Sequence, residues 1–170
     1  QYSTRYGKIE EMVVGLEVVM ADGTVIRTGG APAAATGPDL TELIVGSEGT
    51  LAIITEVTVA LLPKPPHEAV GVAYFDDLAA AAGVVAAVVA EGIRPSTLEF
   101  LDQTCISVVE DYAQLGLDTD AGALLVFGDD GSLEASEATA DRIADICRDH
   151  GARSTTRAAT ASDAADLLAA

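Results

Sequence analysis

Basic residues are scarce in this chain of 170 residues. Nine lysines and arginines stand against 27 aspartates and glutamates, which gives a formal net charge of −18. A surface of that sign repels nucleic acid and anionic membranes, so we exclude both as partners. The acidity is consistent with a soluble protein, but it identifies no activity.

Histidine is scarcer still, and the small number of histidines excludes several kinds of catalytic site. The two histidines, His67 and His150, form no cluster with cysteines or carboxylates at the spacing of metal ligands. Ser47 and Ser107 have no histidine near them in the sequence, so the pattern does not support a nucleophilic triad. We therefore predict no metal site and no catalytic residue within this chain.

Long apolar runs and a secretory signal are also missing. The longest apolar run, Ala79–Ala90, is shorter than the ~20 residues of a membrane span and predicts a buried helix. We expect a cytoplasmic protein that reaches a membrane only through partner subunits. The two cysteines, Cys105 and Cys147, are predicted to be buried thiols in a reducing compartment, with a disulfide or a reactive thiol as the alternative.

The first part of the sequence has the pattern of a β-hairpin followed by a short helix. Two β-rich runs, Val13–Met20 and Thr24–Thr28, are separated by a turn of the Asp-Gly kind. A loop of small residues at 29–37 follows. A helix is predicted from Asp39 toward Val45, and Gly46 is expected to end it as a glycine cap.

A turn of the form Gly-x-x-Gly comes next and leads into a strand. Gly46-Ser47-Glu48-Gly49-Thr50 precedes the β-branched run Ile53–Val59. Glycines permit positive φ and close approach of a ligand to the backbone, and successive N–H groups in such a turn can hold an anion. By itself the pattern is also typical of an ordinary tight turn, and it matches neither a Walker loop nor Gly-x-Gly-x-x-Gly.

A proline-rich stretch, Pro63-Lys64-Pro65-Pro66, predicts the boundary between two domains at residues 1–66 and 67–170. Beyond it strands and helices alternate, which predicts an α+β layer with helices over one face of a sheet. The expected strands are 69–75, 97–101, 123–127 and 153–157, and the expected helices begin after Asp76 or Asp77, Asp102, Ser132 and at Ser162.

Apolar periodicity predicts which helix residues face the core. The expected inward residues are Cys105, Val108, Val109 and Tyr112 in one helix, and Leu133, Ile143, Ile146 and Cys147 in another. Asp129-Asp130-Gly131 is predicted to be a turn rather than a calcium loop. Glu99 and Asp102 are interpreted as surface and capping residues, and His150 as a residue at a helix C-terminus.

Three strings in this sequence together resemble a known family. They are the stretch Gly46–Val57 continued to Pro66, the tripeptide Arg5-Tyr6-Gly7, and Leu98-Glu99-Phe100-Leu101-Asp102. The chain resembles the FAD-linked oxidases of the vanillyl-alcohol-oxidase type. Within them it is most similar to the branch that holds the glycolate oxidase FAD subunit and the D-lactate and D-2-hydroxyglutarate dehydrogenases. Ala52 stands where family members usually have glycine.

The resemblance implies both a fold and a reaction. The fold is α+β: the second half of an FAD-binding domain, joined to the start of a cap domain of antiparallel sheet plus helices. The reaction is oxidation of a 2-hydroxy acid of the glycolate or D-lactate type by hydride transfer to FAD. Residues implied to line the flavin are Tyr6, Gly7, Gly46, Ser47, Glu48, Gly49, Thr50, Ile53 and Ile54.

The same resemblance implies that the sequence is a central fragment. Family members run to several hundred residues, with a pyrophosphate-binding loop upstream and histidine-bearing motifs downstream of the matching part. We therefore expect the isolated 170 residues to be inactive, with weak or no flavin binding. The expected partners are a small hydroxy-acid substrate and a second copy of the chain or other subunits.

Two alternatives stay open. The string from Ser3 to Glu10 also resembles the alkyl-glycerone-phosphate synthase branch, in which the flavin serves a carbon–oxygen exchange with no net redox change. The other is a non-catalytic acidic module in which residues 67–170 bind a partner. Tyr6 has its own alternative, because a terminal tyrosine is also typical of a packing anchor.

Overall fold

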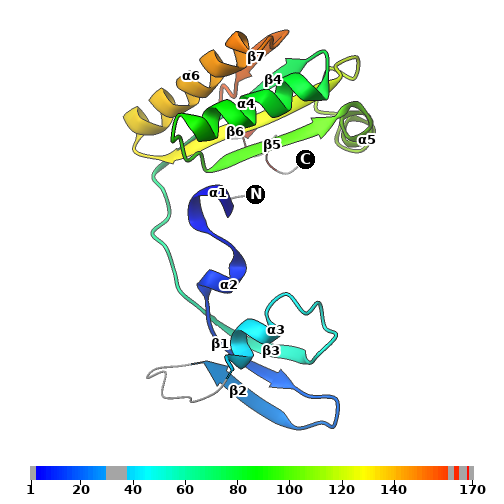
Figure 1. Ribbon diagram of the computed structural model, residues 1–170, viewed down its shortest axis with the longest axis vertical. Helices are drawn as coiled ribbons and strands as arrows, with labels where there is room; N and C mark the ends of the chain where they lie inside the picture. Colours follow the sequence, from blue (N-terminus) through cyan, green and yellow to red (C-terminus); the bar gives the residue numbers. More distant parts are fainter. Residues whose placement is uncertain (1–2, 30–37, 161–162, 165–167, 169–170) are drawn as a thin grey trace. The chain divides into compact units, whose positions relative to one another are not determined.

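The computed structural model describes residues 3–29, 38–160, 163–164 and 168 (Figure 1). The chain divides into two compact units. We call Gly7–Pro63 the hairpin unit, and Gln1–Tyr6 with Lys64–Ala170 the sheet unit. Each is described by itself.

The hairpin unit contains a three-stranded antiparallel sheet of order β2-β1-β3. Strands β1 (Val13–Val19) and β2 (Val25–Gly29) form the predicted hairpin. Its turn is held by Asp22, whose carboxylate accepts the Thr24 N–H at 2.9 Å. Two short helices, α2 (Ile9–Met12) and α3 (Leu40–Ile44), and strand β3 (Ile53–Val59) complete the unit.

The core of the hairpin unit is small and lies between α3 and the sheet. Leu16, Val18, Ile44 and Ala52 are its buried side chains. The helix predicted from Asp39 is present, and Asp39 itself caps it by accepting the N–H groups of Thr41 and Glu42. The loop predicted at 29–37 falls almost wholly outside the described residues.

The sheet unit contains a four-stranded antiparallel sheet of order β5-β6-β4-β7. Its strands are β4 (His67–Phe75), β5 (Thr97–Asp102), β6 (Ala123–Gly131) and β7 (Ser154–Arg157). Its helices are α1 (Ser3–Tyr6), α4 (Leu78–Ala90), α5 (Gln103–Ala113) and α6 (Leu133–Asp149). The mixed helix and antiparallel-sheet fold predicted from the sequence is confirmed.

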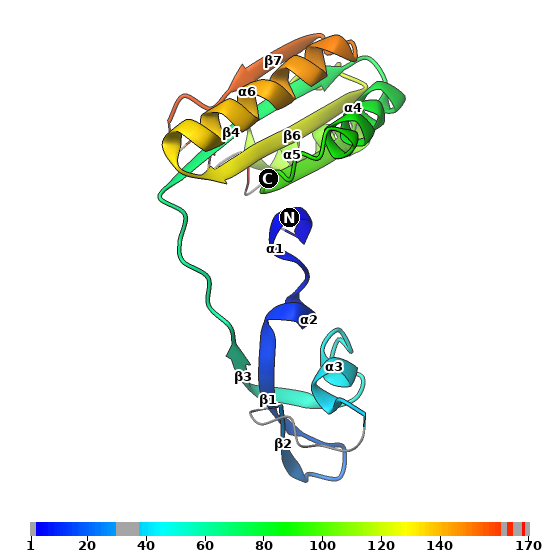
Figure 2. The same ribbon diagram turned by 60° about the vertical axis from the view of Figure 1, so that its left-hand side comes forward.

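Helices α4 and α6 lie side by side over one face of this sheet (Figures 1 and 2). Phe75 and Phe127 from the strands pack there against Val84 of α4 and Ile143 of α6. On the other face, Val72 and Val126 belong to a second cluster of buried residues that includes Ile106 of α5. Helix α5 therefore covers part of this second face, beside β5 and β6.

The helix caps of the sheet unit agree with the sequence prediction. Side-chain oxygens of Asp77, Asp102 and Ser132 accept N–H groups in the first turns of α4, α5 and α6. His150 follows α6, and its Nδ1 lies 2.9 Å from the Ile146 carbonyl oxygen. Ser162, the predicted start of a last helix, lies outside the described residues.

The predicted turn at Asp129-Asp130-Gly131 is wrong. These residues are the end of β6, which pairs with the first residues of β4, so that Asp129 lies opposite Ala69 and Asp130 opposite Glu68. Both aspartates are buried, each 5% exposed. Because β4 begins at His67, the ladder extends past the apolar part of β6 and draws the two acidic residues into the sheet.

The predicted inward faces of α5 and α6 are partly wrong. Cys105 is exposed, and Val108 and Tyr112 are 63% and 93% exposed. Only Ile106 is buried in α5, and Val109, three residues further on the same side of the helix, is half-buried. Of the predicted stripe, only Val109 therefore faces the sheet. In α6 the other three predicted residues are buried, but Leu133 is 62% exposed because it stands in the first turn, where the helix is just beginning.

Candidate functional site

The Gly46–Thr50 turn has a rigid and unusual backbone. Three of its residues have positive φ: Gly46 at 81°, Glu48 at 50° and Gly49 at 78°. The Ile44 carbonyl accepts the Ser47 N–H, and the Ser47 carbonyl accepts the Thr50 N–H, both at 3.0 Å. The Thr50 hydroxyl also donates to the Ser47 carbonyl, at 2.7 Å. The turn therefore holds its own shape, and the two hydroxyl-bearing residues contribute to that shape.

Open space lies beside both glycines of this turn. A Cβ atom added to Gly46 or Gly49 would meet nothing within 4 Å. Glycine is therefore required at these positions by the backbone angle and not by packing against the protein. The space that a side chain would fill is free for a ligand that approaches the backbone.

The strand that follows the turn is exposed along its whole length. All seven residues of β3 are exposed, with Ile53 at 69% and Ile54 at 42%. Among the described strands, β3 pairs only with β1 and is an edge of its sheet. Ala52, in contrast, is buried in the core of the hairpin unit, so its methyl group points away from this exposed surface.

Tyr6 and Gly7 belong to different units. The Tyr6 hydroxyl donates to Asp130 Oδ2 at 2.6 Å in the sheet unit, and the Arg5 guanidinium pairs with Asp129 and Asp130. Gly7 has φ of 81°, and a Cβ there would lie 2.7 Å from the Glu11 carboxylate. The structure thus brings together the turn with Ile53 and Ile54. Whether Tyr6 and Gly7 join them stays a prediction.

Burial and charge perturb the acid–base behaviour of the Tyr6 site. Burial, followed by the hydrogen bond to Asp130, raises the pKa of Tyr6 to about 12. Burial also raises the pKa of Asp129, although the Arg5 charge opposes the shift. The sequence pattern did not indicate this buried acidic pair, because Asp129 and Asp130 were predicted to form a turn. The available signal was that two aspartates directly continue an apolar strand run and its glycine, Gly128.

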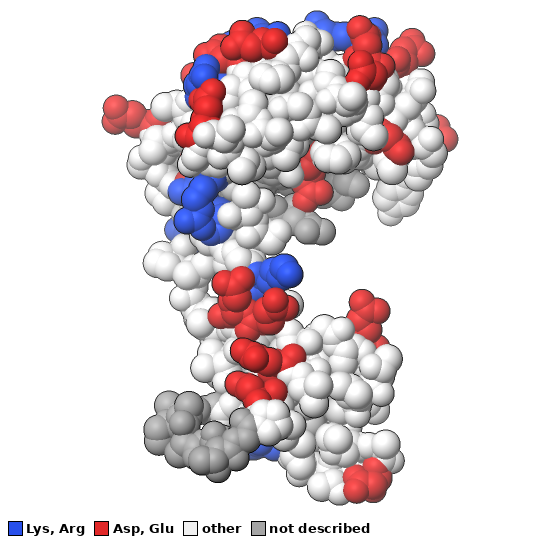
Figure 3. Space-filling view, in the orientation of Figure 1, with Lys and Arg blue, Asp and Glu red and all other residues white. Residues whose placement is uncertain are grey.

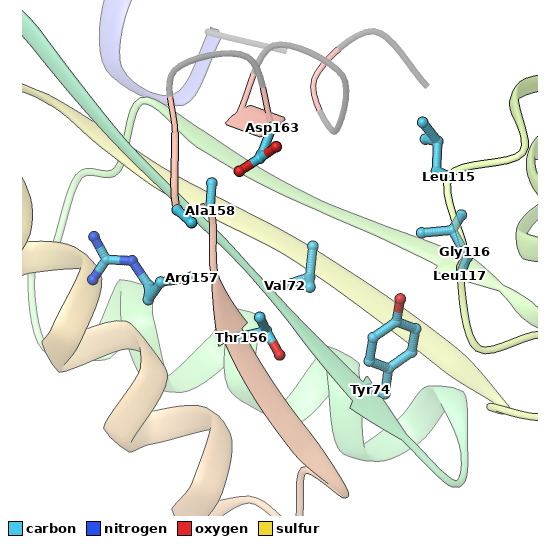
Figure 4. A pocket seen from close by; sticks show the side chains of 10 residues that line it. Val72, Tyr74, Leu115, Gly116, Leu117, Thr156, Arg157, Ala158 and Asp163 are labelled. Carbon is cyan, nitrogen blue, oxygen red and sulfur yellow. The ribbon is translucent and has the colours of Figure 1, made fainter.

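A second feature missed from the sequence is a cavity of about 490 Å³ in the sheet unit (Figure 4). Val72 and Tyr74 of β4 form its floor together with Thr156 and Arg157 of β7, and the loop at 115–117 forms a wall. Burial raises the pKa of Tyr74, as expected for a half-buried phenol. The lining is mainly apolar, with hydroxyl groups as its neutral polar features.

The positive charge beside this cavity is already paired. Arg157 donates to Glu137 and to Asp141 of α6, both at 2.7 Å, and its guanidinium extends toward that helix in Figure 4. His67 Nε2 lies 3.0 Å from the other oxygen of Glu137. The hydrogen bond from His67 and the Arg157 charge lower the pKa of Glu137. Arg157 therefore ties β7 to α6 rather than presenting a free cation to the cavity.

Neither a metal site nor a membrane span is found in the part of the chain that the structure describes. No group of three or more histidine, cysteine or acidic side chains is placed to hold a metal ion. None of the described helices has the length and apolar character needed to cross a bilayer. In Figure 3 acidic side chains form several separate groups on the visible surface, with uncharged residues between them.

The fold is shared with proteins of known structure. One is titled "alkyldihydroxyacetonephosphate synthase in P1", with a TM-score of 0.68 at 22% identity over 98% of this chain and 34% of that one. Another is p-cresol methylhydroxylase with substrate bound, with a TM-score of 0.63 at 20% identity over 89% of this chain and 35% of that one. At such identities these likenesses define the fold alone.

Proteins of similar sequence indicate the class of protein more closely than the fold does. The glycolate oxidase subunit GlcD of Bacillus subtilis is 46% identical over 161 residues, which are 94% of this chain and 34% of that protein. GlcD of Escherichia coli K12 is 37% identical over 87% of this chain and 30% of that protein. The mitochondrial D-lactate dehydrogenase [cytochrome] of Arabidopsis thaliana is 42% identical over 63% of this chain and 19% of that protein.

The fold and the similar proteins together identify the chain as part of an FAD-linked oxidoreductase. A family model described as "FAD linked oxidases, C-terminal domain" matches residues 64–170. The chain belongs to this family, and the resemblance read from the sequence is confirmed. It spans about a third of the length of the GlcD proteins it matches.

Proposed function

We propose that this chain is part of an FAD-dependent oxidoreductase that oxidises a 2-hydroxy acid of the glycolate or D-lactate type. The names of its relatives support this substrate class. FAD, when bound, supplies the acceptor for the hydride that leaves the α-carbon of the acid. The chain's own part is to hold and orient that cofactor.

One observation carries the cofactor assignment: the open, rigid turn at Gly46–Thr50 beside an exposed edge strand. Gly46 and Gly49 leave room for a ligand against the backbone, while Ser47 and Thr50 fix the shape of the turn. Strand β3, which holds Ile53 and Ile54, is an edge strand among the described strands, so its outward-facing backbone groups are open to the same ligand. We propose that these residues line the edge of the flavin.

The remaining assignments follow from the family resemblance. Tyr6 and Gly7 are proposed to line the flavin, and Glu48 to lie at its rim. Residues 1–66 are proposed to complete an FAD-binding domain, and 67–170 to begin a substrate domain. The name "subunit" carried by the GlcD relatives supports assembly with other chains in the whole protein.

The alternative, an alkyl-glycerone-phosphate synthase type of reaction, is weaker. Its support is a fold likeness at 22% identity, whereas a GlcD relative reaches 46%. Family membership likewise favours a flavoenzyme over an acidic module without cofactor.

Cofactor binding is tested by titrating FAD into the purified chain and following flavin fluorescence anisotropy. We expect weak binding, because the turn offers backbone groups and hydroxyls but no cation to neutralise the charged pyrophosphate of FAD, and Glu48 is itself negative. Binding that is equally strong in Gly49→Ala would reject the turn as a cofactor site. Tight binding together with turnover would contradict the expectation that the isolated chain is inactive.

Substrate class is tested in a chimera. The 161-residue matching segment of the B. subtilis GlcD protein is replaced by this chain, and reduction of an electron-accepting dye is measured with glycolate and with D-lactate. We expect activity with one of the two acids. A folded chimera that holds FAD but oxidises neither acid would overturn the proposal.

A further inference from the structure

The cavity of about 490 Å³ in the sheet unit has a wall that the protein itself holds in place. That wall is the loop at 115–117, and Glu110 fastens it to α5. The two carboxylate oxygens of Glu110 accept the N–H groups of Gly116 and Leu117 at 3.1 and 2.9 Å. Pockets of about 300–1,000 Å³ that form before the ligand arrives are typical of small-molecule sites. The cavity has this size, and its wall is formed without a ligand.

The other sides of the cavity are fixed in a similar way. Its floor belongs to the sheet, in which Val72 of β4 is paired with Thr156 of β7. Asp163 lies at the upper side of the cavity in Figure 4. Its carboxylate accepts the Thr160 N–H at 2.9 Å, and the Thr160 hydroxyl accepts the Asp163 N–H at 3.2 Å. These two hydrogen bonds fix Asp163 at the rim of the cavity.

The described lining of the cavity offers a negative charge but no unpaired positive charge. Asp163 is exposed and is the one acidic residue of this lining. Arg157 is its one basic residue, but the guanidinium donates to Glu137 and Asp141 and extends toward α6 in Figure 4. The whole chain has a net charge of −18. An anionic ligand is therefore repelled from this cavity, whereas a cationic ligand is attracted to it.

The rest of the lining suits an apolar molecule with one polar end. Leu115 and Leu117 supply aliphatic side chains to one wall. Val72 and Tyr74 point from the floor toward the upper side of the cavity in Figure 4. Tyr74 is half-buried, and an aromatic ring accepts contact with an apolar group or with a cation on its face. An apolar body and a cationic head thus both have complementary surfaces here.

We propose that this cavity binds a small amphiphilic amine. The apolar body of the ligand lies against Leu115, Leu117 and Tyr74, and its ammonium group points toward Asp163. This ligand differs from the proposed substrate, because a hydroxy acid would bring a second carboxylate to Asp163 and meet no unpaired cation in the described lining. The proposal therefore does not depend on the proposed function, and either one can fail without the other.

Three probes that share a phenyl group and a two-carbon chain separate the effect of charge from that of size. They are phenethylamine, phenethyl alcohol and hydrocinnamate, which are positive, neutral and negative at neutral pH. Each is titrated into the purified ¹⁵N-labelled chain, and its Kd is taken from the shifted amide signals of Gly116, Leu117 and Thr156. We expect the amine to bind at least threefold more tightly than the alcohol and at least tenfold more tightly than the acid. The proposal is overturned if the acid binds as tightly as the amine, or if the amine leaves these amide signals unshifted.

The variant Asp163→Asn tests the charge at the rim, since its amide oxygen still accepts the Thr160 N–H. We expect phenethylamine to bind at least threefold more weakly and phenethyl alcohol to bind as before. Asp149→Asn is the matched control, because it removes the same charge from an exposed position of α6 outside the described lining. It is expected to leave the Kd of all three probes unchanged. If both variants weaken amine binding equally, net charge alone attracts the amine and the site is overturned; an unchanged Kd in Asp163→Asn overturns it as well.

Discussion

Three glycines of the hairpin unit allow the cofactor turn to be tested against a nearly identical control. Gly23, Gly46 and Gly49 have φ of 84°, 81° and 78°, and a Cβ on any of them would meet nothing within 4 Å. Alanine at such angles costs about 1–2 kcal/mol of folding free energy because of backbone strain. No clash adds to that cost, so the three alanine variants are expected to lose equal stability.

Their effects on the cofactor are expected to differ. Gly23 lies in the turn of the β1–β2 hairpin, whereas Gly46 and Gly49 lie in the proposed flavin turn. A methyl group at either of the latter two fills the space that the cofactor needs. We expect FAD affinity to fall at least tenfold, equivalent to about 1.4 kcal/mol.

Stability is measured by urea unfolding followed by circular dichroism, and affinity by flavin fluorescence anisotropy. Gly23→Ala shows how much apparent affinity is lost merely because less protein is folded. Equal FAD affinity in all three variants would show that Gly46 and Gly49 do not lie against the cofactor. The same conclusion would follow if Gly23→Ala weakened FAD binding as much as Gly49→Ala does.

Three further predictions concern the sheet unit. Gln114 ends α5 with φ of 53° and ψ of 48°, so Gln114→Gly should stabilise the unit by roughly 1 kcal/mol, seen as a higher urea midpoint. Glu137 has a lowered pKa in the folded chain, so its stabilisation is present above the ordinary value of 4.5 and is lost as pH falls through the folded value. The difference in urea midpoint between the unmodified chain and Glu137→Gln should therefore shrink below about pH 4.5, and a constant difference would contradict the assignment. Thiol labelling of the folded chain should modify Cys105 and spare Cys147, which is fully buried with a pKa raised to about 12. The Asp102 carboxylate raises the pKa of Cys105, so Asp102→Asn should speed that labelling at constant pH.

Features set by neighbouring residues could be predicted from the sequence. Asp77, Asp102 and Ser132 cap helices as expected, because a capping side chain needs only the amides two or three residues ahead of it. The hairpin turn and the glycine-rich turn could be predicted for the same reason, since the positive φ angles that they need are local and favour glycine. The glycine-rich turn of the candidate site could therefore be predicted from the sequence, because its shape depends on backbone angles.

Features that depend on distant segments could not be predicted. Asp129 and Asp130 lie in a strand because β4, some 60 residues earlier, extends far enough to pair with them. Periodicity in α5 indicated a stripe of apolar residues but not which side of the helix the sheet would cover, and Ile106 alone decides that side. The contact of Tyr6 with Asp130 is the most distant case, and no local pattern indicates it.

The two ends of the three-stranded sheet in the hairpin unit lie next to each other. Val13 at the start of β1 is paired with Val59 at the end of β3, and the Ala60 N–H donates to the Met12 carbonyl at 2.8 Å. The chain thus enters and leaves this sheet through neighbouring residues, which is an arrangement that tolerates exchange of the segment between them. The sheet β5-β6-β4-β7 takes no strand from that segment. Residues 13–59 could therefore be replaced by another segment whose ends pair in the same way, and the strand order of the other sheet would stay unchanged.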